Sequence, residues 1–129
     1  MRLAGYAALF DVPDAAKDTI RRGAFAHTLS GRKQPVPLLW QHRANARIGT
    51  VETLAEDARG LRVVARIDRP QSRAAALLRA NSVSGLSFGY RARGFRRTAH
   101  GRVLEDIELL EVSLVTHPLQ PGARVHLVL

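Results

Sequence analysis

Apolar and polar residues alternate along most of this chain, in short segments separated by turns that contain Gly, Pro or Asp. A period of two places successive side chains on opposite faces of a strand, so the pattern predicts strands with one buried face. The predicted strands are Arg2–Phe10, Val36–Gln41, Ile48–Ala55, Leu61–Ile67, Leu86–Phe95, Val103–Thr116 and Val125–Leu129, with a short extended piece at Asp18–Arg21.

Two segments have helical spacing instead. Apolar residues four positions apart predict a helix over Gly23–Ser30, and Pro70 is expected at the first position of a helix that runs to about Ala80. Many short strands with hairpin connections favour a mainly β fold over a parallel α/β sheet. We therefore expect one domain over residues 1–129, a small antiparallel β-barrel of six to seven strands with short flanking helices.

The composition excludes several classes of chemistry. The chain has no cysteine, which rules out disulfides, thiol catalysis and iron–sulfur clusters. Its histidines are scattered, and neither a metal-ligand motif nor a phosphate-binding glycine loop is present, so we expect no metal and no cofactor. No apolar run approaches the roughly 20 residues of a membrane span, and the N-terminus lacks a signal-peptide pattern, so no membrane association is expected.

The net charge of +9 is unevenly distributed. Residues 59–102 contain eleven arginines and a single acid, whereas residues 103–112 contain four acids. A segregated charge of this kind is typical of proteins with a polyanionic partner, either nucleic acid or an acidic protein surface. A general preference for arginine in the genome explains the excess equally well.

A serine in the second half of the chain is the candidate nucleophile. Residues 85–89 read G-L-S-F-G, which matches the G-x-S-x-G letters of the α/β-hydrolases. That motif needs a helix after the serine, whereas here an alternating strand follows. Alternation places Ser87 on the face opposite Leu86 and Phe88, with Gly89 beside it. It therefore lies outside the barrel, where small neighbours let a substrate backbone approach.

The candidate acid–base residues lie at or near strand ends. His42 ends an apolar strand, and its ordinary pKa near neutrality suits a general base. In the long strand Leu110 is expected to face the core with Val112, while Glu111 faces outward and can approach Ser87 if the two strands are neighbours. His117 follows that strand and is a second candidate. The remaining histidines, which are His27, His100 and His126, are expected to be ordinary surface residues.

Taken together, a set of segments in fixed order resembles the HK97-type prohead serine proteases of tailed phages, prophages and gene transfer agents. Each segment alone is unspecific, but the ordered set covers almost the whole chain. The segments are Gly5-Tyr6-Ala7, Phe10-Asp11, Asp18, Gly23-Ala24-Phe25, Leu39-Trp40-Gln41-His42, Ile48-Gly49, Gly60-Leu61, Gly85-Leu86-Ser87-Phe88-Gly89-Tyr90, Leu110-Glu111-Val112-Ser113-Leu114-Val115-Thr116 and Pro118.

The resemblance implies a serine endopeptidase with the fold of the herpesvirus assemblins. It would act inside the immature procapsid, in the cytoplasm of the bacterial host. Its partners would be scaffold segments and the major capsid protein, whose scaffold-like N-terminal region it cleaves, and it would cleave itself; it could form a homo-oligomer. The family's nucleophile and base correspond to Ser87 and His42. Glu111 matches its acidic position, and His117 is the alternative third member, as in the herpesvirus relatives.

Two other functions are compatible with the sequence. An arginine-rich barrel could bind nucleic acid, but such modules pair basic residues with exposed aromatic residues. Here Phe88 and Tyr90 lie on the strand face that is expected to be buried in the core. A non-catalytic capsid assembly factor with the same fold is the second alternative, against which the presence of both Ser87 and His42 argues.

Overall fold

The structure is a computed structural model that describes residues 1–129, and it confirms a mainly β fold with two short helices. The predicted strands are present, and three of them extend further than the alternation indicated. The strands are β1 (Arg2–Leu9), β2 (Asp18–Ile20), β3 (Val36–Trp40), β4 (Arg43–Glu56), β5 (Gly60–Ile67), β6 (Gly85–Thr98), β7 (Gly101–Val115) and β8 (Val125–Val128), and the helices are α1 (Ala26–Ser30) and α2 (Arg73–Arg79).

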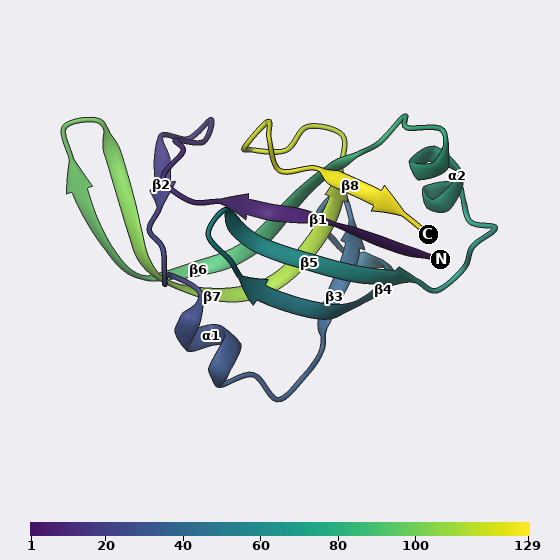
Figure 1. Ribbon diagram of the computed structural model, residues 1–129, viewed down its shortest axis with the longest axis horizontal. Helices are drawn as coiled ribbons and strands as arrows, with labels where there is room; N and C mark the ends of the chain where they lie inside the picture. Colours follow the sequence, from purple (N-terminus) through teal and green to yellow (C-terminus); the bar gives the residue numbers. More distant parts are fainter.

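The strands form one curled, 8-stranded sheet in the order β2-β7-β3-β4-β5-β1-β8, with β6 paired to β7 (Figure 1). The expectation of six to seven antiparallel strands is wrong in two respects. The count is higher, and β7 pairs in parallel with both β2 and β3. Parallel pairing occurs there because long crossovers, rather than tight hairpins, connect these strands along the chain.

Residues 123–125, which lead into β8, bridge the opening between β1 and β6. Val125 donates its N–H to the carbonyl of Ser84 at 2.8 Å, and the N–H of Leu86 donates to the carbonyl of Ala123 at 2.9 Å. On its other side, the same segment pairs with β1 through Gly5 and Val125. These bonds satisfy main-chain groups at the start of β6, so that the curled sheet is nearly closed into a barrel.

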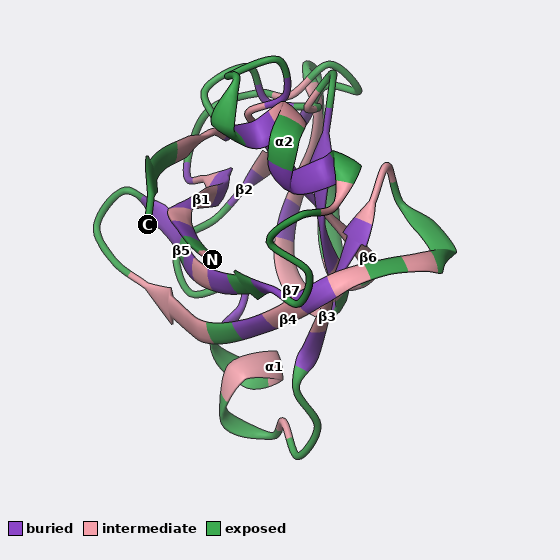
Figure 2. Cartoon of the chain, turned by 90° about the vertical axis from the view of Figure 1, so that its right-hand side faces the viewer, coloured by how far each residue is buried: buried purple, intermediate pink, exposed green.

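The core fills the inside of this curled sheet, and Figure 2 shows α2 covering one end of it. Leu86 and Val112 are fully buried, as the alternation predicts, and Phe88 packs edge-on against the buried ring of Phe25 at 5.4 Å between centroids. Apolar burial of this extent is the main stabilising contribution to the fold.

Both helices are shorter than the sequence indicated. Residues 23–25 form turns, so that α1 begins only at Ala26. Pro70 does not open α2, because Ser72 is the N-cap and its hydroxyl accepts a hydrogen bond from the N–H of Ala75. A serine cap satisfies a free helical N–H, which proline cannot do, and this explains where the helix begins.

The arginine-rich part of β6 is largely paired with acids on β7. Arg91 and Arg93 both contact Glu108, and Arg96 lies 3.7 Å from Glu105. The two oppositely charged segments of the sequence are therefore partners across one long hairpin, whose end projects from the barrel (Figure 1). Part of the charge segregation reflects cross-strand pairing, because three of the eleven arginines in residues 59–102 contact acids of β7 and are less available to a polyanion than the sequence indicated.

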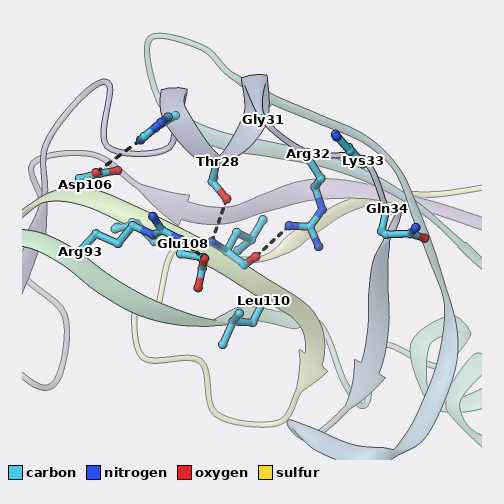
Figure 3. Close-up of a pocket in the computed structure, with 12 residues that line it drawn as sticks. Thr28, Gly31, Arg32, Lys33, Gln34, Arg93, Asp106, Glu108 and Leu110 are labelled. Atoms are coloured by element: carbon cyan, nitrogen blue, oxygen red, sulfur yellow. Dashed lines mark hydrogen bonds and ion pairs between the residues drawn. The ribbon is translucent and has the colours of Figure 1, made fainter.

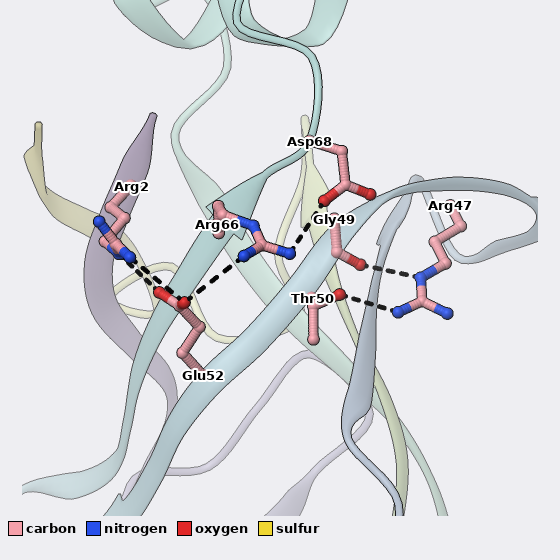
Figure 4. A network of polar contacts seen from close by, with 7 residues as sticks. All are labelled: Arg2, Arg47, Gly49, Thr50, Glu52, Arg66 and Asp68. Atoms are coloured by element: carbon pink, nitrogen blue, oxygen red, sulfur yellow. Dashed lines mark hydrogen bonds and ion pairs between the residues drawn. The ribbon is translucent and has the colours of Figure 1, made fainter.

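A second polar network lies across β1, β4 and β5 (Figure 4). Glu52 accepts hydrogen bonds from Arg2 and lies 3.9 Å from Arg66, which in turn contacts Asp68 at 3.6 Å. These side chains are substantially exposed, so each pair contributes little to stability and the network chiefly favours the correct strand register.

Candidate active site

A two-residue turn between β3 and β4 carries His42. Trp40 pairs with Arg43, and the two residues between them, Gln41 and His42, have φ values of 52° and 61°. Positive φ at both central positions is the requirement of a type I′ hairpin turn, which usually contains Asn or Gly. Two side chains that are uncommon in this conformation therefore mark the turn as a place where backbone strain is tolerated for another purpose.

The imidazole of His42 is bound by Glu111 of β7. Its Nδ1 lies 2.7 Å from Oε1 of Glu111, whose side chain is only 12% exposed. Because a carboxylate only accepts hydrogen bonds, Nδ1 carries the proton and Nε2 is left free as a base. The hydrogen bond to Glu111 raises the pKa of His42 above its ordinary 6.5, and the partial burial of the ring opposes this rise.

Ser113 is a functional residue that the sequence reasoning did not single out. It is fully buried, its hydroxyl donates to Oε2 of Glu111, and it accepts the N–H of His42 at 3.1 Å. One side chain thus holds both the carboxylate and the backbone of the base. The sequence did offer one signal. Ser113 lies two positions after Glu111 in a predicted strand, so alternation predicted that the two side chains share a face.

A β-bulge in β7 lies directly before Glu111. Gly89 pairs with Glu111 but Tyr90 pairs with Leu109, so Leu110 is an extra residue on β7. Leu110 is therefore 41% exposed, and the expectation that it faces the core is wrong. A bulge of this kind turns neighbouring side chains toward the same face, as is common beside active sites.

Gly89 provides the space for the carboxylate. A Cβ at this position would lie 2.8 Å from Oε1 and 2.9 Å from Cγ of Glu111. Gly89 was expected to admit a substrate backbone next to Ser87. In the structure its lack of a side chain instead accommodates Glu111, which is close enough to pair with His42 only because nothing projects from β6 at this point.

Ser87 lies directly across from Ser113 on the neighbouring strand. Opposed residues of an antiparallel pair have Cβ atoms about 5 Å apart, so Ser87 is within about one side-chain length of the group formed by His42, Glu111 and Ser113. No hydrogen bond joins its hydroxyl to His42. In structures without substrate such catalytic hydrogen bonds are commonly long and shorten when substrate binds.

Ser87 is also less accessible than expected, with 5% of its surface exposed. It lines a small, mostly apolar hollow together with Leu119 and Gln120 from the segment that follows β7. Gln120 fixes that segment, because its amide donates to the carbonyls of Leu9 and Val12 and accepts the N–H of Leu9. This anchored segment therefore lies beside Ser87.

The other histidines do not join this group. His117 is exposed just beyond β7, and no hydrogen bond or ion pair joins its side chain to His42 or Glu111. His27 lies 3.7 Å from Asp106, and His126 packs against Tyr6. Among these residues, it is Glu111 that forms a hydrogen bond with His42.

A hollow of about 530 Å³ lies between α1, the segment that follows it and β7 (Figure 3). Leu109 donates its N–H to the hydroxyl of Thr28 and accepts a hydrogen bond from Arg32 at 2.9 Å. These side chains satisfy the edge of β7 between its pairings with β2 and β3. Leu110 is on its margin, but His42, Glu111 and Ser87 do not line it.

No part of the structure groups three or more histidine, aspartate or glutamate side chains at metal-binding distance. No helix is long and apolar enough to span a membrane. On β6, Arg91 and Arg93 are engaged by Glu108.

Comparison with known sequences gives a match over the whole chain. A family model described as caudovirus prohead serine protease matches residues 1–129. The prohead protease of Enterobacteria phage HK97 is 30% identical over 128 residues, which are 94% of this chain and 57% of that protein. The chain therefore spans less than two thirds of the length of this relative.

Solved structures with the same fold come from viruses of two kinds. KSHV protease, crystallised with a hexapeptide phosphonate inhibitor, aligns with a TM-score of 0.69 and 13% identity over 96% of this chain and 63% of that one. The capsid assembly protease of bacteriophage T4 aligns with a TM-score of 0.70 and 15% identity over 88% of this chain and 80% of its own. Varicella-zoster virus protease aligns with a TM-score of 0.66 and 18% identity over 96% of this chain and 62% of its own.

Proposed function

Because the chain belongs to the caudovirus prohead serine protease family, we propose that it is the catalytic domain of a serine endopeptidase that matures a phage procapsid. The observation that carries this proposal is the hydrogen-bonded group of Glu111, Ser113 and His42, in which Ser113 is paired across the strands with Ser87. A serine beside a histidine that is itself held by a carboxylate is the arrangement that activates a hydroxyl for acyl transfer.

In the proposed reaction, Nε2 of His42 removes the proton of Ser87 as its oxygen attacks the peptide carbonyl. His42 then gives this proton to the leaving amine, and water repeats the cycle to release the acyl group. Glu111 keeps the proton on Nδ1 and stabilises the imidazolium while it exists. Main-chain N–H groups next to Ser87 stabilise the oxyanion.

An extended substrate has a free strand edge available beside Ser87. β6 pairs with β7 along one edge, and beyond Leu86 its other edge has no strand partner. A peptide that adds to this edge would satisfy the main-chain groups of Phe88 and Tyr90 and would run past the nucleophile. Extended, flexible segments of a scaffold or capsid protein are suited to this mode of binding.

The proposed substrates are the scaffold, or the scaffold-like N-terminal region of the major capsid protein, and the protease itself. The proposed place of action is the interior of the immature procapsid, in the host cytoplasm. A protease enclosed with its substrates encounters them at a high effective concentration, so that moderate affinity is sufficient.

Co-expression with the neighbouring capsid protein gene tests the proposal. Intact mass measurement is expected to show a shortened capsid protein with the wild-type protease and a full-length one with Ser87→Ala or His42→Ala. Circular dichroism of each variant checks that the fold is retained. Normal processing by the Ser87→Ala variant would contradict the serine protease function.

A further inference from the structure

The turn that carries His42 is attached to the end of β7 by Gln41. The main-chain N–H of Gln41 donates to the carbonyl of Leu114 at 3.0 Å. Its side-chain amide donates to the hydroxyl of Thr116, and its amide oxygen accepts the N–H of Thr116 at 3.2 Å. One residue therefore makes three hydrogen bonds to Leu114 and Thr116, at and just beyond the end of β7.

These bonds hold the turn against the strand that also carries Glu111 and Ser113. At the next peptide, the N–H of His42 donates to Ser113. Two successive main-chain N–H groups of the turn are thus bonded to the strand that carries the carboxylate partner of the base. A displacement of about 1 Å at such a place is sufficient to cost a large part of a catalytic rate.

Glutamine is an unfavourable residue for the backbone of this turn. Gln41 has a φ of 52°, in the left-handed region that favours glycine and asparagine. A turn that served only to join β3 to β4 would be better made with glycine. The benefit of glutamine must therefore come from its side chain, whose polar atoms all bind Thr116.

We propose that Gln41 is a positioning residue for His42, which fixes the turn on β7 so that the imidazole is directed toward Glu111 and Ser87. The inference rests on the proposed protease function. It extends that function by giving a role to the residue before the base, whose own side chain has no chemistry to contribute.

The first test compares Gln41→Gly with Asn81→Gly. Asn81 also has a positive φ, of 58°, and lies exposed after α2, so Asn81→Gly controls for the introduction of glycine in this backbone conformation. For Gln41→Gly we expect an unfolding temperature close to that of the wild type, an unchanged KM for a peptide substrate and a kcat lowered on the order of 100-fold. Asn81→Gly should keep the wild-type kcat. Wild-type kcat in Gln41→Gly, or equal losses in both variants, would overturn the proposal.

Thr116→Val serves as a second variant if Gln41→Gly does not fold. It removes only the hydroxyl that accepts from the Gln41 amide and keeps the main-chain N–H. A smaller fall in kcat with unchanged KM is expected, and wild-type kcat would count against the proposal.

A measurement that needs no activity separates this inference from the proposed function. In the Ser87→Ala protein, the Nδ1 proton of His42, held by Glu111, is expected to give a downfield proton NMR signal. Adding Gln41→Gly should broaden or remove this signal, whereas adding Asn81→Gly should leave it unchanged. An unaltered signal with Gln41→Gly would overturn the positioning role, whether or not the chain cleaves capsid protein.

Discussion

Oε1 of Glu111 lies 2.7 Å from Nδ1 of His42, although the two residues are 69 positions apart in the chain. Two features of the fold produce this contact: a glycine on β6 that leaves room for Glu111, and a tight turn that holds His42 against β7. The contact favours Glu111 over His117 as the third member of the proposed triad. Both features are open to experiment.

The first prediction concerns the carboxylate. Glu111→Gln keeps the size of the side chain but removes its charge, and its amide can donate to Nδ1 and favour the wrong tautomer of His42. Peptide cleavage is expected to slow by roughly 10⁴-fold, the cost of the comparable change in a well-characterised triad. His117→Ala should have little effect. Steady-state kinetics of both folded variants decide the question, and the reverse ranking would assign the role to His117.

The second prediction concerns the space beside the carboxylate. Gly89→Ala places a methyl group against Glu111, which two hydrogen bonds hold in position, so that kcat should fall while the protein remains folded. Gly94→Ala is the matched control on the same strand, because its Cβ would make only an ordinary contact of 3.4 Å with Asp106. Equal kcat values for the two variants would show that the position of Glu111 does not matter.

The third prediction is the dependence of activity on pH. His42 acts as a base only when neutral, so activity falls as pH decreases through its pKa. Because Glu111 raises the pKa of His42, the acid limb of kcat/KM should lie above 6.5. The limb should move to lower pH in the residual activity of Glu111→Gln. A limb below 6.5 in the wild type, or one that Glu111→Gln does not move, would contradict the pairing.

The fourth prediction concerns stability near the turn of the β6–β7 hairpin. Asp18 is buried and accepts two hydrogen bonds from Arg102, which lower the pKa of this carboxyl. Arg102→Met leaves the carboxylate without this partner and should reduce the free energy of unfolding by about 2 kcal/mol at neutral pH. The exposed Arg66 offers a control, since Arg66→Met should cost under about 0.5 kcal/mol.

The difference in free energy of unfolding between wild type and Arg102→Met should depend on pH, and this dependence checks its cause. A lowered pKa stabilises the fold above the unfolded-state pKa of aspartate, near 3.8, and this contribution disappears as pH falls through the folded-state value. The difference in free energy of unfolding between wild type and Arg102→Met, measured with urea, should therefore become smaller below pH 3.8. A gap that stays constant into acid would mean that Arg102 stabilises the protein by packing alone.

Alternation in the sequence was sufficient to predict most strands, the burial of Leu86 and Val112, and the shared outward face of Glu111 and Ser113. It was wrong for Leu110, because this residue lies in a bulge. A bulge depends on how β7 pairs with β6, and alternation within a single strand carries no information about that pairing. Local rules also misplaced the start of α2, where the cap at Ser72 takes precedence over the proline.

The site was predictable only in part, for a similar reason. The sequence pointed to Ser87 and His42 but left Glu111 and His117 as alternatives, since nothing local shows which of them approaches the imidazole. The hydrogen bond between His42 and Ser113 and the one between Gln41 and Thr116 each join residues more than 70 positions apart. Such contacts follow from the parallel pairing of β3 with β7, which the sequence did not indicate.

The most direct test of the proposed chemistry is the labelling of Ser87 by a peptide phosphonate, which reacts only with an activated serine. Mass spectrometry after proteolytic digestion is expected to find one adduct, on Ser87. His42→Ala should abolish it, and Glu111→Gln should slow its formation strongly. Labelling at another serine, or at Ser87 with the same rate in all three proteins, would contradict the account.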